Sequence, residues 1–226
     1  MLEAIVFDFD GVIADSEPLH FRSFRDVLAE EGLALSEAAY YERFLGLSDA
    51  AAFRAFAAEH GKPWSEREAA DLMRRKAARF ETLERDTRLI FPEAERLVRE
   101  AAAVVPIAVA SGARRVEILR ILDRADLTRC FAAVVAVEDA AAGKPAPDPY
   151  LRALERLSAS AARSISPRRT VAIEDSPHGI ESARAAGMKT VLVTTARVAG
   201  RESGADVIVG SLSALNLTNL HRLAQD

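Results

Sequence analysis

Residues 4–16 read AIVFDFDGVIADS, an apolar run that is followed at once by two aspartates and a glycine. Consecutive apolar residues are typical of a strand that is covered on both faces. Side chains two positions apart in an extended chain point to the same side, so Asp8 and Asp10 can face one bound group while Phe9 packs away from it. Two carboxylates so close are unfavourable unless a cation or a proton relieves them. We interpret the segment as a buried strand that leads into a reaction centre. The alternative is a strand with an acidic turn, because Asp and Gly are common turn residues.

Further short apolar runs recur along the chain, with helical patterns between them. They span residues 106–110, 132–137, 170–173, 190–193 and 207–209. The alternation of strand and helix predicts an open, parallel α/β sheet whose faces are covered by helices. Ligands bind such sheets beyond the carboxyl ends of the strands, so the polar residues that follow each run are the candidates for chemistry.

A long stretch without strand signals interrupts this alternation after the first run. Residues 17–88 carry several helical patterns, and we expect them to form an inserted helical domain. The sheet domain would then consist of residues 1–16 and 89–226. Ser36 and Ser65 are expected to cap helices of the insertion, the second in a capping box.

Composition and charge exclude several classes of function. The chain has 226 residues, of which half are apolar and more than a quarter are charged, as in ordinary soluble proteins. A net charge of −4 gives no broad positive field, so we expect no nucleic acid partner. The single cysteine, Cys130, excludes an internal disulfide and a multi-cysteine metal site, and its apolar neighbours favour a buried, inert thiol. No apolar segment is long enough to cross a bilayer, and the N-terminus lacks the positive start of a secretion signal. We therefore expect a cytoplasmic monomer that binds no membrane.

Two polar segments contain candidate phosphate-binding groups. Ser111 and Gly112 precede a helical pattern, and a hydroxyl with backbone amides at a helix start can bind an anion such as phosphate. The alternative is an ordinary helix cap. Lys144 lies among prolines in GKPAPD (143–148) and can deliver a fixed positive charge, although a surface lysine in a rigid turn is the alternative. Asp148 is expected to cap the next helix.

Two adjacent acids, Glu174 and Asp175, follow the apolar run at residues 170–173. They precede a helix that Ser176 is expected to cap. Adjacent carboxylates at a strand end suit an oxygen-ligated divalent ion. Mg²⁺ is favoured because it accepts few protein ligands and keeps waters and substrate in its shell.

The four acidic groups, Lys144 and Ser111 together form a set suited to phosphoryl transfer, which requires a clamp of positive charge and donors around the transferred group. Four segments resemble the four ordered motifs of the haloacid dehalogenase-like superfamily: DFDGV (8–12), ASG (110–112), GKPAPD (143–148) and IEDS (173–176). The resemblance spans nearly the whole chain. It implies an α/β fold with a Rossmann-like open parallel sheet core, an inserted helical cap domain, and an aspartyl-phosphate intermediate.

The resemblance also implies catalytic and phosphate-binding roles. Asp8 would be the nucleophile that attacks phosphorus, and Asp10 would protonate the leaving oxygen and then activate water. Lys144 would complete the catalytic set, and Ser111 and Gly112 would bind the phosphoryl group with it.

The implied cofactor is Mg²⁺. It would be bound by the Asp8 carboxylate, the Asp10 backbone carbonyl and Asp175, with Glu174 supporting the ion.

Members of the superfamily that cleave carbon–halogen bonds do not resemble this chain at Asp10, which argues against a dehalogenase.

Residues of the helical insertion bear on the substrate. His20, Lys76 and the loop with Gly46 resemble substrate-binding positions of the β-phosphoglucomutases. His20 also shares an apolar stripe and is equally consistent with a packed histidine, and the basic run at residues 74–76 is interpreted as a solvated helix face. Asp49 stands where these mutases carry a basic residue, and it would repel the distal phosphate of a bisphosphate.

We therefore expect a phosphoric monoester hydrolase, a Mg²⁺-dependent phosphatase of a small phosphorylated metabolite such as a sugar phosphate or a phosphoglycolate-like compound. The alternative is a phosphomutase of the β-phosphoglucomutase type. A binding module without turnover would be expected to lack at least one of Asp8, Asp10, Lys144 and Asp175, and all four are present.

Overall fold

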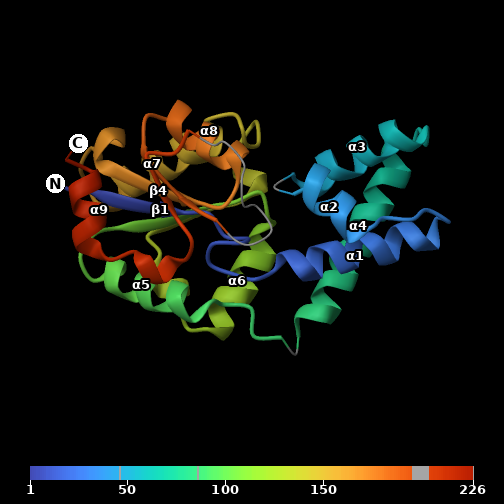
Figure 1. Cartoon of the computed structure of the whole chain (residues 1–226), viewed down its shortest axis with the longest axis horizontal. Helices are drawn as coiled ribbons and strands as arrows, with labels where there is room; N and C mark the ends of the chain where they lie inside the picture. The colour runs from blue at the N-terminus through green and yellow to red at the C-terminus, as the bar shows by residue number, and fades with distance from the viewer. Residues whose placement is uncertain (46, 86, 195–203, 226) are drawn as a thin grey trace. The chain divides into compact units, whose positions relative to one another are not determined.

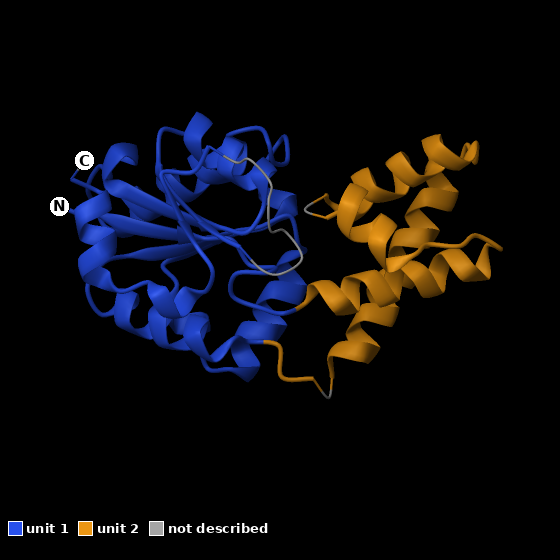
Figure 2. Cartoon of the chain, viewed as in Figure 1, with its two compact units in different colours: residues 1–15, 90–226 blue, residues 16–89 orange. Residues whose placement is uncertain are grey.

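The computed structural model describes residues 1–45, 47–85, 87–194 and 204–225. The chain divides into two compact units, shown in Figure 2. Unit 1 consists of Met1–Asp15 and Ile90–Asp226, and unit 2 of Ser16–Leu89. Along the described part of the chain, no helix is both long and apolar enough to span a membrane.

Unit 1 is built on a parallel sheet of six strands in the order β3-β2-β1-β4-β5-β6, counted over the residues that the structure describes. The strands are β1 Ala4–Phe7, β2 Ile107–Ala110, β3 Ala133–Val135, β4 Thr170–Glu174, β5 Lys189–Val193 and β6 Val207–Val209. Every residue of β1, β2 and β4 is buried, as strands covered on both faces require.

Helices cover both faces of this sheet. They are α5 Pro92–Ala102, α6 Arg115–Arg124, α7 Asp148–Ser160, α8 Pro177–Ala185 and α9 Leu217–Leu223. In Figure 1, α7 and α8 lie on one face of the sheet, and α5 and α6 lie on the other. Residues of α7 and α8, such as Leu157 and Ala183, pack in one core cluster with Val6 and Ala172 of the central strands. The predicted open α/β sheet is confirmed.

The register of the central strands determines where the acids lie. Phe7 of β1 is paired with Ile173 of β4, and the Asp8 amide donates a hydrogen bond of 2.9 Å to the Ile173 carbonyl. Asp8 and Glu174, far apart in sequence, therefore leave neighbouring strands at the same edge of the sheet.

Unit 2 is helical, with α1 Glu17–Glu30, α2 Glu37–Arg43, α3 Asp49–His60 and α4 Glu66–Glu84. Its core is aromatic, and includes Phe24, Tyr40 and Phe53. Ser36 accepts a hydrogen bond from the Ala39 amide as the N-cap of α2. Ser65 forms a capping box at the start of α4, so both predicted caps are confirmed.

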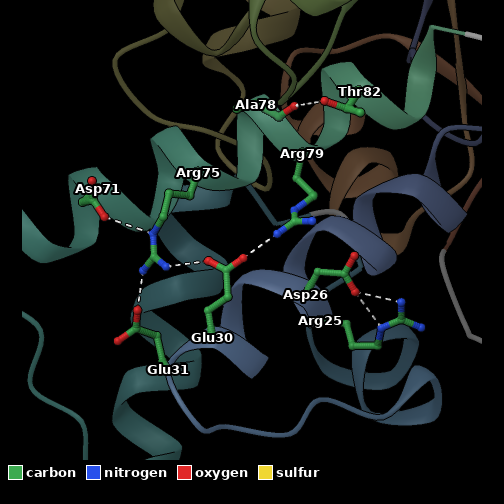
Figure 3. A network of polar contacts seen from close by, with 9 residues as sticks. All are labelled: Arg25, Asp26, Glu30, Glu31, Asp71, Arg75, Ala78, Arg79 and Thr82. Carbon is green, nitrogen blue, oxygen red and sulfur yellow. Dashed lines mark hydrogen bonds and ion pairs between the residues drawn. The ribbon is translucent and has the colours of Figure 1, made fainter.

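Ion pairs join α1 to α4 along their exposed side, as Figure 3 shows. Arg75 pairs with Glu30 at 2.7 Å and also with Glu31, and Arg79 pairs with Glu30. Arg74 is the exposed member of the basic run, with 72% of its side chain accessible, whereas Arg75 is 26% exposed and Lys76 is fully buried. The interpretation of residues 74–76 as a solvated helix face is therefore wrong for Lys76 and only partly right for Arg75.

Two local predictions for unit 1 need correction. Cys130 is partly exposed and not buried, because it lies in a short 3-10 turn ahead of β3. Asp148 is the first residue of α7 and not its cap, and Pro147 occupies the cap position without a side-chain hydrogen bond. Asp148 in the first turn still interacts favourably with the helix dipole.

Candidate active site

Three acids predicted as metal ligands meet at the carboxyl edge of the sheet. Asp8 follows β1, Glu174 ends β4 and Asp175 comes next in the chain. One carboxylate oxygen of each lies within 4.8 Å of the others, and all three residues are buried. The parallel pairing of β1 with β4 brings these groups together.

Gly11 follows the second predicted aspartate and allows the chain to pass close to Asp175. Its φ angle is +79°, a conformation that residues with a Cβ rarely adopt. A Cβ atom at this position would also lie 2.0 Å from the Asp175 Oδ2 atom. Both the backbone conformation and the space beside Asp175 therefore require glycine.

Ser111, directly after β2, contacts Asp10. The Ser111 hydroxyl donates to Asp10 Oδ2 at 3.5 Å and accepts a hydrogen bond of 3.0 Å from the Ala113 amide. Ser111 is almost fully buried, while Gly112 is exposed, and a Cβ atom added to Gly112 would meet nothing within 4 Å. The predicted phosphate-binding turn is therefore adjacent to the predicted acid, and Gly112 leaves its surface open to an incoming group.

Lys144 lies between two of the acids. Its Nζ is 2.7 Å from Asp8 Oδ1 and 2.5 Å from Glu174 Oε1. Only 7% of the side chain is exposed, which excludes the alternative of a surface lysine in a rigid turn. The motif that contains Lys144 thus brings a buried positive charge to the group of carboxylates.

Glu174 is fully buried and both of its oxygens accept hydrogen bonds. Oε1 accepts from Lys144 and from the Tyr150 hydroxyl at 2.6 Å. Oε2 accepts from the Asp175 amide at 3.2 Å, and from the Ser176 amide at 3.4 Å and hydroxyl at 3.1 Å. The Ser176 hydroxyl also accepts from the Gly179 amide, so Ser176 is the N-cap of α8, as predicted.

Tyr150 is the site residue that sequence reasoning missed. It follows Pro149 at the start of α7, where an aromatic residue on the apolar side of a helix is most simply a core residue. Its ring does pack in the core, and only the tertiary structure shows that its hydroxyl reaches Glu174.

Burial and crowding shift the pKa values of these groups. Burial and the neighbouring Glu174 charge raise the pKa of Asp8 to about 8, against the opposing effect of Lys144. Burial alone would lower the pKa of Lys144, but the Asp8 and Glu174 carboxylates outweigh burial and raise it. Burial and the Glu174 charge also raise the pKa of the Tyr150 hydroxyl, which keeps it a hydrogen-bond donor at neutral pH.

The donor set fits a hard divalent cation. Ionisation of all three buried carboxyl groups would leave more negative charge than the Lys144 ammonium, which contacts Asp8 and Glu174, can balance, and this excess is unfavourable in a buried environment. Oxygen ligands of this kind are those that Mg²⁺ prefers, and the ion would remove the excess charge.

The predicted substrate residues of unit 2 form a cluster of their own. Lys76 Nζ lies 2.7 Å from His20 Nδ1 and 2.7 Å from Asp49 Oδ1, and the His20 ring stacks on Phe80 at 4.3 Å between centroids. His20 is thus both packed and hydrogen-bonded. The pairing of Asp49 with Lys76 was missed, and it means that the Asp49 charge is balanced locally. Gly46 lies outside the described residues.

Comparisons with known proteins show the family to which the chain belongs. The family model for haloacid dehalogenase-like hydrolases matches residues 5–193. Hexitol phosphatase B of Escherichia coli (strain K12) is 31% identical over 222 residues, which cover 96% of each protein. Beta-phosphoglucomutase of Bacillus subtilis (strain 168) is 29% identical over 225 residues, covering 97% of this chain and 94% of that protein.

A solved structure shows the same fold. CbbY from Rhodobacter sphaeroides, in complex with phosphate, has a TM-score of 0.86 and 28% identity, covering 97% of this chain and 99% of that one. The predictions of an enzyme of the phosphatase type and of a sheet core with a helical insertion are confirmed. The chain belongs to the haloacid dehalogenase-like hydrolase family, in the branch that contains phosphatases and β-phosphoglucomutases.

Proposed function

We propose that this chain is a Mg²⁺-dependent phosphatase that hydrolyses a phosphorylated sugar or polyol through an aspartyl-phosphate at Asp8. The observation that carries the proposal is the buried triangle of Asp8, Lys144 and Glu174, joined by contacts of 2.7 Å and 2.5 Å. The Asp8 carboxylate, the proposed nucleophile, lies beside a fixed positive charge at the sheet edge where ligands bind.

In the first step, an Asp8 oxygen would attack phosphorus and the bond from phosphorus to the ester oxygen would break. Asp10 would give its proton to the departing oxygen, so that an alcohol leaves. The Ser111 hydroxyl, 3.5 Å from Asp10 Oδ2, supports the orientation of that carboxyl group.

In the second step, Asp10 would take a proton from water as the water oxygen attacks phosphorus. The bond between phosphorus and the Asp8 oxygen would then break, which releases inorganic phosphate and restores Asp8. Lys144 would bind the phosphoryl oxygens in both steps, because its ammonium group is fixed beside Asp8.

The proposed cofactor, Mg²⁺, would be held by the Asp8 carboxylate, the Asp10 backbone carbonyl and Asp175, with Glu174 in support. It would supply neutralisation of the charge on the phosphoryl oxygens.

The proposed substrate class is supported by the relatives and by unit 2. Hexitol phosphatase B, by its name, acts on phosphorylated hexitols, and it is similar to this chain over nearly its whole length. The buried Lys76 ammonium is already paired with the Asp49 carboxylate, so its charge is not left for a second phosphate group, which favours a substrate with one phosphate group over a bisphosphate. A sugar or polyol monophosphate meets both conditions.

A phosphate-release screen tests this proposal. The purified chain would be incubated with Mg²⁺ and hexitol phosphates, hexose phosphates, phosphoglycolate or p-nitrophenyl phosphate. We expect the highest kcat/KM with a sugar or polyol phosphate, and no phosphate release by Asp8→Asn. Release by Asp8→Asn at the wild-type rate would overturn the mechanism.

A second assay separates hydrolysis from phosphomutase activity. With β-glucose 1-phosphate and a bisphosphate primer, we expect inorganic phosphate to accumulate. Accumulation of glucose 6-phosphate at a higher rate would instead assign the chain to the mutase activity of its relative from Bacillus subtilis.

A further inference from the structure

Tyr150 is a fully buried polar residue to which the proposed reaction assigns no role. It lies in the first turn of α7, directly after the loop that carries Lys144. Its ring belongs to the core cluster that contains Val135, Ala153 and Leu157. The ring therefore has a fixed position, and the hydroxyl extends from it to Glu174 Oε1 at 2.6 Å.

Tyr150 and Lys144 converge on one oxygen atom. The Lys144 ammonium lies 2.5 Å from the same Oε1, and it also lies 5.4 Å from the centroid of the Tyr150 ring. The hydroxyl thus contacts the acceptor of Lys144 while the ring contacts Lys144 itself. A ring face attracts a cation at this distance, so both parts of Tyr150 favour one position of the ammonium group.

The opposite oxygen of Glu174 is held from another element. Oε2 accepts from the Ser176 hydroxyl at 3.1 Å and from two backbone amides. A carboxylate offers about four lone-pair positions, and the donors around Glu174 occupy them from both sides. Glu174 is therefore a rigid acceptor, with Tyr150 fixing one end and Ser176 the other.

The lysine side chain needs such an acceptor. Lys144 has a flexible stem and three rotatable donors, and its position depends on what its ammonium group contacts. We infer that Tyr150 is a positioning residue: its hydroxyl holds Glu174 Oε1 in place, and Glu174 in turn holds the Lys144 ammonium beside Asp8. This inference rests on the proposed function, because Lys144 must bind a phosphoryl group for its position to matter.

Tyr150→Phe tests the inference, because it removes the hydroxyl and keeps the ring. We expect kcat/KM for p-nitrophenyl phosphate to fall about 10-fold, as small misplacements of a charged group in a site have large effects. Tyr40→Phe is a matched control, since the Tyr40 hydroxyl donates to the Glu17 carboxylate at 2.8 Å in unit 2. The control should stay within about twofold of wild type, as expected of a bond with no part in the chemistry.

A double-mutant cycle with Lys144→Ala separates positioning from a purely structural role. The readout is the affinity for inorganic phosphate in the presence of Mg²⁺, measured by calorimetry. Tyr150→Phe should lower the affinity for phosphate about 10-fold in the wild-type background. In the Lys144→Ala background the same substitution should lower it less than twofold, because the two residues act as one unit. Equal weakening in both backgrounds, or no weakening in either, would overturn the inference.

If Tyr150→Phe does not fold, a second variant tests the role of Glu174 in holding Lys144. Ser176→Ala removes a hydrogen bond to the other Glu174 oxygen, and its effect on phosphate affinity should also disappear in the Lys144→Ala background. An effect that persists there would contradict the positioning role of Glu174. If the wild-type chain releases no phosphate from any ester, the proposed function fails. If it releases phosphate and Tyr150→Phe does the same at the wild-type rate, only this inference fails.

Discussion

The Lys144 ammonium and the Asp8 carboxylate form an ion pair of 2.7 Å in which the side chains are 7% and 10% exposed. A buried charge is stable only if it is paired and hydrogen-bonded. Lys144 satisfies this condition by contacting Glu174 as well as Asp8. The two carboxylates therefore keep the buried Lys144 ammonium protonated, and the lysine supplies the positive charge that phosphoryl transfer requires.

Replacing Lys144 tests the chemical role of this pair. Lys144→Met keeps an unbranched side chain, one atom shorter than that of lysine, but removes its charge. We expect kcat/KM for the best phosphate ester to fall about 10²- to 10³-fold, the range for loss of one preorganised group in a transition state. Lys62→Met, at an exposed position, is the control and should leave the rate unchanged. A Lys144→Met variant with more than half of the wild-type rate would contradict the role of the lysine.

The raised pKa of Asp8 predicts a pH-dependent effect of Mg²⁺ on stability. A carboxyl group whose folded-state pKa is about 8, against 3.8 for an ordinary aspartate, makes folding less favourable as pH rises through that window. Mg²⁺ binds the ionised form and should reverse this loss. We expect Mg²⁺ to raise the melting temperature more at pH 8 than at pH 5.5.

Thermal unfolding with and without Mg²⁺ at both pH values measures this difference. Asp8→Asn should reduce the pH dependence, because the substituted group does not ionise. An equal or larger effect of Mg²⁺ at pH 5.5 in the wild type would show that Asp8 does not control binding.

Gly179 lies beside the buried Glu174 in the first turn of α8. A Cβ atom there would be 1.9 Å from Glu174 Cδ, whereas a Cβ atom at Gly210 would meet nothing within 4 Å. We expect Gly179→Ala to destabilise the chain by about 1–3 kcal/mol, as overpacking does, and to lower activity by displacing Glu174. Gly210→Ala should change stability by less than about 0.5 kcal/mol. Urea unfolding compares the two, and equal stabilities would show that Glu174 has room to move.

Loss of Lys76 and loss of Asp49, which form an ion pair in unit 2, should lower the stability of the chain by different amounts. Lys76 is fully buried, while 23% of the Asp49 side chain is exposed. Asp49→Ala leaves the Lys76 charge buried and should lower the free energy of unfolding by about 2 kcal/mol. This is less than the loss expected for a fully buried pair, because Asp49 is partly exposed. Lys76→Met leaves a carboxylate that water can reach and should cost less. Urea unfolding of both variants checks the order, and the opposite order would contradict it.

Much of the fold and of the central site could be predicted from the sequence, because both depend on local patterns. The apolar runs around Val6 and Ala172 lie in parallel strands as expected, since strands buried on both faces need continuous apolar sequence. Asp8 follows the first strand, and Glu174 and Asp175 are the last residue of the other strand and the one after it, so their meeting follows from the topology of the sheet.

The remaining contacts depend on tertiary structure. The Tyr150 hydroxyl of α7 contacts Glu174 of β4, and Asp49 of α3 contacts Lys76 of α4. The partners come from different elements, so neither pair has a fixed spacing in the sequence. Lys76 also shows why a run of like residues is misleading. Arg74, two positions earlier, is turned to solvent, because successive residues of a helix point about 100° apart and residues two apart therefore point to nearly opposite sides.

Trapping of the covalent intermediate tests the central claim most directly. Asp10→Asn should accumulate it from p-nitrophenyl phosphate, because nitrophenolate leaves without a proton whereas the attack of water needs a base. Borohydride reduction of the acyl phosphate, followed by peptide mass spectrometry, would locate the modified residue. For the Asp10→Asn variant incubated with p-nitrophenyl phosphate and Mg²⁺, the account predicts that reduction converts Asp8 to homoserine. A variant that still releases phosphate but leaves Asp8 unmodified would contradict it.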